Sequence, residues 1–218
     1  AEHKTLIGEQ MRRAIGIPKQ SLDLVSPYFV PTQAGVEAFA QLRSQGLRIR
    51  ILTNALEATD VAIVHAGYAK YRKQLLQAGI ELYEMRGQAP EYAGEDEKLK
   101  LNFTQFGSSG TSLHAKTFAV DGQRAFVGSF NFDPRSMLLN TEMGLLIESP
   151  TLAKQISESF DSQIPSRAFR VSLDDEGHLR WISGVGQPPP QYTTEPQTRW
   201  YQRWTIWFLG LLPIEWLL

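Results

Sequence analysis

The residues best suited to chemistry lie between positions 114 and 131. His114 and Lys116 are two residues apart, and the run from Lys116 to Val120 is typical of a β-strand. Side chains two apart on a strand point to the same side of the sheet, so we expect the imidazole and the ammonium to converge. Imidazole accepts and gives protons near neutral pH, and an ammonium binds anions. The pair predicts a site for an anionic group such as phosphate.

Two hydrogen-bond donors follow on the next predicted strand. Ser129 and Asn131 share one strand parity, so that a hydroxyl and an amide point into one site. Gly128, which precedes them, allows backbone to approach closely. Together with Lys116, these donors suit the oxygens of a tetrahedral anion.

Asp121 lies at the turn between the two strands. Asp121-Gly122 supplies the positive φ angles of a type I′ turn and connects strands at 116–120 and 123–127. Its strand parity is opposite to that of His114. The spacing alone therefore predicts a turn residue, and not a neighbour of His114 at the substrate.

Strands and helices alternate around this region. Apolar patterns and turn residues predict strands at 22–26, 47–51, 80–84, 143–147, 169–173 and 178–182, and helices from Thr32 to Gly46, from Asp60 to Ala78 and from Pro150 onward. This order predicts an α/β fold with a mixed β-sheet flanked by helices. Residues 87–112 are expected to form a long loop.

Three further patterns concern single elements. Thr32 is expected to cap its helix. Arg48 and Arg50 alternate with apolar residues, which predicts one wetter strand face. The apolar run from Met143 to Ile147 suits a buried strand.

Composition excludes several classes of protein. Lys and Arg number 22 against 23 Asp and Glu, giving a net charge of -1, so the electrostatic signature of a nucleic-acid-binding protein is missing and such a partner is not expected. The 218 residues include no cysteine, which excludes disulfide scaffolds, thiolate zinc sites and a cysteine nucleophile. We expect neither a metal nor another cofactor.

The C-terminal region differs in composition from the rest. Residues 1–186 are predicted to form one catalytic lobe, 187–198 a Pro-rich linker, and 199–218 a Trp-rich amphipathic tail. Trp200, Trp204, Trp207 and Leu211 share one helical face, with Arg199 and Arg203 in reach of phosphate groups. This pattern favours a membrane interface. The alternative is a helix packed on a part of the same protein that is missing from this sequence.

The spacing His114-x-Lys116-x4-Asp121-x6-Gly128-Ser129-x-Asn131 resembles the signature of the phospholipase D superfamily. The strings 26–31, 71–79, 131–136 and 140–144 look like the second lobe of bacterial cardiolipin synthases, closest to the C type. The resemblance covers nearly the whole chain. It implies an α/β sandwich and phospholipid substrates.

For the chemistry, the resemblance implies a two-step transfer at phosphorus through a phosphohistidine, without a metal. It counts His114, Lys116, Asp121 and Glu142 as catalytic, although parity assigns Asp121 to the turn. By the same resemblance, Ser129 and Asn131 hold the phosphoryl oxygens, Glu142 accepts a hydrogen bond from His114, and His114 serves as general acid and base.

The chain contains one such motif, whereas the family's active site needs two. His65 and His178 lack the lysine two residues on. A second lobe, supplied either in cis or by a homodimer partner, is therefore required.

The resemblance implies a phosphatidyltransferase that forms cardiolipin from phosphatidylglycerol and a donor phospholipid, with phosphatidylethanolamine a candidate donor. It places the protein peripherally on the bacterial cytoplasmic membrane surface. Two alternatives stay open: a homodimeric phosphodiesterase or nuclease of the same superfamily, and an isolated lobe without activity.

Overall fold

The computed structural model describes residues 16–87 and 113–212. The strands are β1 (Ser21–Val25), β2 (Arg48–Asn54), β3 (Glu81–Met85), β4 (Thr117–Val120), β5 (Arg124–Gly128), β6 (Gly144–Glu148), β7 (Ala168–Leu173), β8 (Leu179–Ser183) and β9 (Gln191–Tyr192). The helices are α2 (Thr32–Ser44), α3 (Ala62–Gln77), α4 (Pro134–Leu138), α5 (Pro150–Ser162), α6 (Ile164–Arg167) and α7 (Trp200–Gly210).

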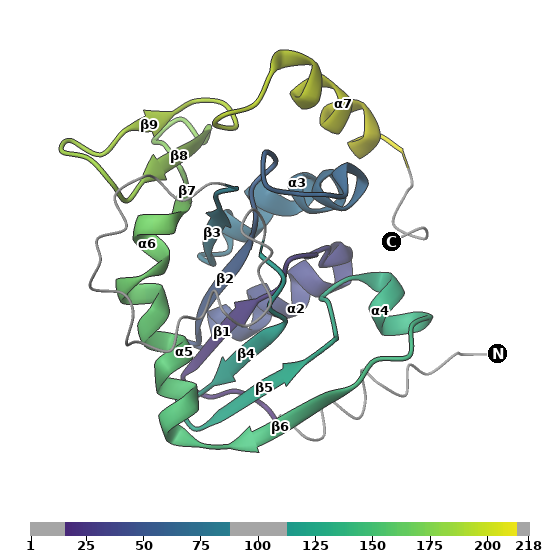
Figure 1. Ribbon diagram of the computed structural model, residues 1–218, viewed down its shortest axis with the longest axis vertical. Coiled ribbons are helices and arrows are strands. Elements are labelled where there is room, and N and C mark those ends of the chain that lie inside the picture. Colours follow the sequence, from purple (N-terminus) through teal and green to yellow (C-terminus); the bar gives the residue numbers. More distant parts are fainter. Residues whose placement is uncertain (1–15, 88–112, 213–218) are drawn as a thin grey trace.

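All the strands belong to one sheet, in the order β6-β5-β4-β1-β2-β3-β7-β8-β9 (Figure 1). The three central strands β1, β2 and β3 are parallel, and every other neighbouring pair is antiparallel. Helices α2 and α3 pack on one face, and α5 and α6 on the other. The predicted α/β fold with a mixed sheet is confirmed.

The centre of the sheet is buried on both faces. Ile49 and Ile51 pack under α2 and α3, while Leu52 packs with Phe160 of α5. The prediction of a wetter face is wrong for Arg50, which is only 1% exposed. Its guanidinium is held instead by the carboxylates of Asp23, at 2.5 Å, and of Asp161, at 2.8 Å. Helices on both sides require this buried charge to be paired.

Strand β6 differs from the prediction in the opposite sense. Met143 and Leu145 are 81% and 67% exposed, although their run was expected to be buried. The reason is position, because β6 is the terminal strand and pairs only with β5. An apolar strip thus lies open at this edge of the sheet.

Turn and cap chemistry decide the ends of several elements. Asp121 and Gly122 have φ angles of 55° and 61°, which confirms the type I′ turn between β4 and β5. The Thr32 cap is wrong: Pro31 occupies the cap position of α2, and no side-chain hydrogen bond caps that helix. Ser149 caps α5 by accepting a hydrogen bond from the Leu152 N–H.

The C-terminal region folds back onto the lobe. Residues 191–192 pair with β8 as strand β9, and α7 lies against α3 with Ile206 buried in the contact. Trp200 and Trp204 of α7 are 73% and 58% exposed, and Trp207, at 61% exposure, lies at the border of the contact with α3. The division at residue 186 stays a prediction. Residues 213–218 of the tail lie outside the described residues.

Candidate active site

The candidate active site lies at the carboxyl end of β1, where β4 begins. His114 and Lys116 directly precede β4, and the amide of Gly128 donates to the Lys116 carbonyl at 3.1 Å. The ammonium Nζ of Lys116 lies 3.4 Å from Nε2 of His114 and donates to the His114 carbonyl at 3.1 Å. The imidazole is exposed. The expected convergence of the two side chains is present at an accessible edge.

Three carboxylates act electrostatically on the Lys116 ammonium. Burial lowers the pKa of Lys116, and the negative charges of Glu142, Asp133 and Asp60 act in the opposite direction. Those three residues come from different elements, so the fold gathers them here. No ion pair joins the half-buried Lys116 ammonium to a carboxylate among the described residues. This cation is therefore suited to bind an anionic substrate.

Ser129 and Glu142 join the ends of β5 and β6. The Ser129 amide donates to the Met143 carbonyl at 2.8 Å, and the Met143 amide donates to the Ser129 hydroxyl oxygen at 3.0 Å. The Ser129 hydroxyl donates to Glu142, and the Asn140 amide group donates to the other Glu142 oxygen at 3.2 Å. Glu142 thereby orients Ser129. This differs from the expectation drawn from the family resemblance, because no hydrogen bond joins Glu142 to His114 among the described residues.

Glycine is required where these strand ends meet. A Cβ on Gly128 would lie 2.5 Å from the Met143 carbonyl oxygen, and one on Gly144 would meet the ring of Phe126. Any larger side chain would separate β5 from β6 and displace Ser129.

Asn131 lies on a segment bonded to the loop after β1. Val30 N–H donates to the Phe132 carbonyl at 2.7 Å, and Phe132 N–H donates to the Ser26 hydroxyl at 3.0 Å. The Oδ1 atom of Asn131 is buried and has no hydrogen-bond partner among the described residues. Buried amide oxygens are normally paired. As an acceptor, Oδ1 does not bind phosphoryl oxygens, and only the Nδ2 group of this side chain can donate to them.

Asp121 lies at the opposite end of β4 from His114. Its carboxylate accepts hydrogen bonds from the amides of Lys19, Gln20 and Ser21 at 2.7–3.1 Å. Partial burial raises its pKa, but these three bonds outweigh that effect and lower it. The fold separates Asp121 from the other motif residues, as its parity predicted, and makes it the anchor that aligns β1 with β4.

Residues that the sequence analysis did not single out border the site. The Tyr28 hydroxyl donates to Asp60 at 3.0 Å, and burial with the charges of Asp60 and Asp133 raises the pKa of Tyr28 to about 12. Asp133 caps α4 through the Ser136 amide. Tyr28 follows β1 and Asp60 follows β2, and the carboxyl ends of these parallel strands meet at one edge of the sheet. Their position after the two strands could have indicated from the sequence that they border the site.

Comparison with known proteins identifies the family. Residues 11–164 match the family described as cardiolipin synthase, PLD-like domain. The chain belongs to this family. Cardiolipin synthase C of Escherichia coli is 43% identical over 218 residues, all of this chain. Cardiolipin synthase A of Yersinia pseudotuberculosis is 26% identical over 176 residues, or 81% of this chain.

The chain spans only part of these family members, namely 45% of the Escherichia coli protein and 30% of the Yersinia protein. Two solved structures share the phospholipase D fold. Nuc of Salmonella typhimurium has a TM-score of 0.54 at 17% identity, covering 78% of this chain and 94% of Nuc. Phosphatidylserine synthase of Haemophilus influenzae has a TM-score of 0.53 at 17% identity, covering 75% of this chain and 36% of that one.

Proposed function

We propose that this chain is one lobe of a phosphatidyltransferase that forms cardiolipin from phosphatidylglycerol and a donor phospholipid. The observation that carries the proposal is the His114–Lys116 pair, exposed at the sheet edge beside Ser129 and Glu142, in a chain 43% identical to a cardiolipin synthase. Phosphatidylethanolamine is a candidate donor.

The reaction needs two histidines. A histidine of the second lobe attacks phosphorus, the bond to the leaving alcohol breaks, and His114 gives that alkoxide a proton. His114 then takes the hydroxyl proton of phosphatidylglycerol, whose oxygen attacks phosphorus, breaks the phosphorus–nitrogen bond of the phosphohistidine and frees that histidine. Lys116, the Nδ2 group of Asn131 and the Ser129 hydroxyl, turned from Glu142, hold the phosphoryl oxygens.

The second lobe has a surface to occupy. Exposed apolar side chains gather next to the site on α4, β5 and β6, namely Val127, Leu138, Leu139, Met143 and Leu145. We call this set the β6 face. Exposed apolar patches of this kind mark interfaces. The relative's additional length has room for a lobe in cis, and a second copy of this chain is the other source.

Helix α7 gives the lobe a membrane-facing element. Its exposed rings include a stacked pair, Trp204 and Phe208, with centroids 5.7 Å apart. Tryptophan favours the lipid interface, and we propose that α7 lies in that plane on the bacterial cytoplasmic membrane. No described helix has the length and apolar character needed to cross a bilayer.

The test is lipid turnover by the protein as the cell makes it. His114→Ala removes the acid–base group and Lys116→Ala a charge that holds the phosphoryl oxygens, so each is expected to lower cardiolipin formation from phosphatidylglycerol vesicles by roughly 10²–10⁴-fold. His178→Ala, at an exposed histidine far along the chain, is the matched control. Unchanged cardiolipin formation in His114→Ala would overturn the site. Phosphatidic acid or cleaved nucleic acid as the product would favour the phosphodiesterase or nuclease, and no product the inactive lobe.

A further inference from the structure

A cavity lies between α3, α7 and the end of the sheet. Its volume is about 400 Å³, within the range of small-molecule sites. Most of its wall is apolar, formed by Ala66, Ala69, Leu179, Trp181, Ile206 and Trp207. It shares no lining residue with the candidate active site. An apolar cavity of this size accommodates part of a hydrocarbon chain.

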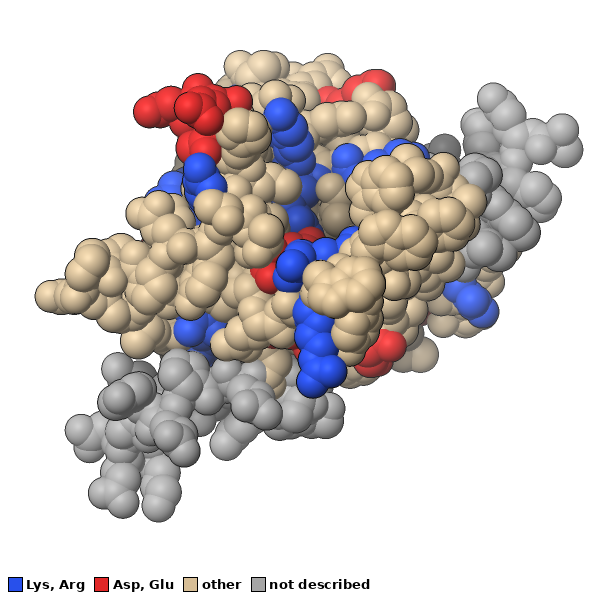
Figure 2. All heavy atoms as spheres, turned by 90° about the horizontal axis from the view of Figure 1, so that it is seen from above, with Lys and Arg blue, Asp and Glu red and all other residues tan. Residues whose placement is uncertain are grey.

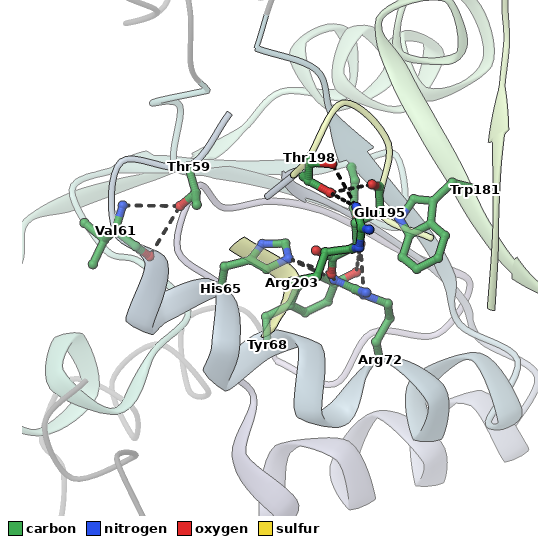
Figure 3. A network of polar contacts seen from close by, with 10 residues as sticks. Thr59, Val61, His65, Tyr68, Arg72, Trp181, Glu195, Thr198 and Arg203 are labelled. Carbon is green, nitrogen blue, oxygen red and sulfur yellow. Dashed lines mark hydrogen bonds and ion pairs between the residues drawn. The ribbon is translucent and has the colours of Figure 1, made fainter. Parts of the chain in front are cut away.

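A polar network adjoins this cavity, and Arg72, Trp181 and Glu195 belong to both (Figure 3). Arg72 of α3 contacts Glu84 at 3.0 Å and Glu195 at 2.9 Å, and Nε2 of His65 lies 3.2 Å from Glu195. Trp181 donates to Glu84 at 2.8 Å. The charge of Arg72 is therefore neutralised by carboxylates inside the protein. Within the cavity wall, the network also connects Arg72 to Glu195 directly and to Trp181 through Glu84.

The cation at the rim, Arg203, differs from Arg72 in having no carboxylate partner among the described residues. Arg203 of α7 lines the cavity, and its guanidinium donates to the carbonyl and hydroxyl oxygens of Thr198 at 2.8 and 3.2 Å. Both partners are neutral, and no carboxylate lies within ion-pair distance of Arg203 in the part of the chain that the structure describes. Its positive charge is uncompensated, which favours an anion at the rim.

The lining also holds the Glu195 carboxylate, but that group is paired with Arg72 and His65. Within residues 16–87 and 113–212, Arg203 therefore stands at the rim without a carboxylate partner. From above, Lys and Arg atoms border a hollow near the centre of the surface, with Asp or Glu atoms in its floor (Figure 2). Trp207, 61% exposed, belongs to both the cavity wall and the aromatic face of α7.

We propose that this cavity binds one anionic phospholipid outside the active site, with its phosphate on Arg203 and part of an acyl chain between α3 and α7. Apolar walls, an uncompensated guanidinium at the mouth and tryptophan beside it match an anionic amphiphile at a bilayer surface. The site goes beyond the proposed catalytic function, because the bound lipid would dock α7 without reacting.

The test titrates the ¹⁵N-labelled chain with soluble dihexanoyl phosphatidylglycerol and follows the tryptophan indole N–H signals by NMR. Trp181 and Trp207 are expected to shift saturably, and Trp200, which does not line the cavity, to shift little. Arg203→Gln should weaken binding about tenfold, the usual worth of a hydrogen bond to a charged group. Arg199→Gln removes the same charge one turn earlier and should weaken binding less than about twofold.

A variant whose side chain fills the cavity tests the proposal independently of the Arg203 charge. Ala69→Phe should abolish the shifts, whereas Ala62→Phe on the exposed side of α3 should not. His114→Ala should bind normally, so loss of turnover and loss of this site are distinguishable. The proposal is overturned by unshifted Trp181 and Trp207 signals, by equal weakening in Arg199→Gln and Arg203→Gln, or by equal shifts with inorganic phosphate.

Discussion

At the scale of single residues, the structure gives Glu142 a different partner from the expected one. Its carboxylate binds the hydroxyl of Ser129 and the amide group of Asn140, with His114 outside that set. This carboxylate holds the Ser129 hydroxyl in one orientation, with its proton on Glu142, so that a bound phosphoryl group competes with Glu142 for that proton. Glu142 is then a positioning residue that acts through Ser129.

This role makes the effects of two substitutions non-additive. Ser129→Ala should lower cardiolipin formation by roughly 10²-fold, as loss of one phosphoryl donor does elsewhere. Glu142→Gln should also lower it, but should add little in the Ser129→Ala background, because both changes remove one interaction. A double-variant cycle of the initial rates measures this coupling. Fully additive effects would show that Glu142 acts elsewhere, with His114 the first candidate.

Glu195 links the residue scale to stability. Burial raises the pKa of Glu195, but the charge of Arg72 and the hydrogen bond to His65 outweigh burial and lower the pKa from 4.5 to about 2. A lowered folded-state pKa stabilises the protein above pH 4.5, and this contribution disappears as the pH falls toward 2.

We therefore expect the wild-type free energy of unfolding to fall by about 3 kcal/mol more than that of Glu195→Gln across this acid range. Urea titrations at a series of pH values measure it. Glu176→Gln, at a carboxylate 80% exposed, is the control. The prediction fails if the Glu195→Gln and wild-type curves stay parallel.

At the scale of elements, Asp121 joins two parts of the sheet. Its carboxylate accepts from three amides just before β1, while its own backbone forms the turn after β4. These bonds align β1 with β4, whose other ends carry the candidate site.

Asp121→Ala should therefore lower the free energy of unfolding by about 1–3 kcal/mol, the cost of unsatisfied amides. Transfer activity per folded molecule should remain close to wild type at low temperature. Thermal denaturation and rates normalised to folded protein separate the two effects. A full loss of activity with unchanged stability would return Asp121 to the catalytic set.

Helix α7 is the element that we propose to bind the membrane. Trp200 and Trp204 are exposed and lie outside the cavity described above. Replacing both with Ala should weaken binding to phosphatidylglycerol vesicles at least about tenfold, because each ring buries apolar area worth about 2 kcal/mol. Vesicle co-sedimentation measures this loss. Tyr192→Ala, an exposed ring on β9, should bind like wild type, and equal losses would exclude α7 as the docking element.

At the scale of the whole molecule, the β6 face and the single motif belong together. One histidine cannot serve as both nucleophile and acid in the same step, so the proposed transfer needs a second lobe. The apolar β6 face lies beside the candidate site. A partner seated there would bury Met143 and Leu145 and bring its own histidine toward His114.

Where this chain is studied alone, we expect it to self-associate through the β6 face. Met143→Lys with Leu145→Lys should shift sedimentation toward the monomer, because buried lysines at an apolar interface carry a large desolvation cost. Ile17→Lys, at an apolar residue 68% exposed elsewhere, is the control. A wild-type monomer at high concentration would leave the lobe in cis as the partner.

The sequence by itself determined the α/β class, the strand order along the chain, the Asp121-Gly122 turn and the convergence of His114 with Lys116. These depend on periods of two and 3.6 residues and on local turn chemistry. Only the tertiary structure decided that Arg50 is buried, that β6 is an exposed edge and that Glu142 binds Ser129. Those outcomes depend on which elements pack against each other in the folded protein. The residue pattern of one segment carries no information on which other segments will lie beside it.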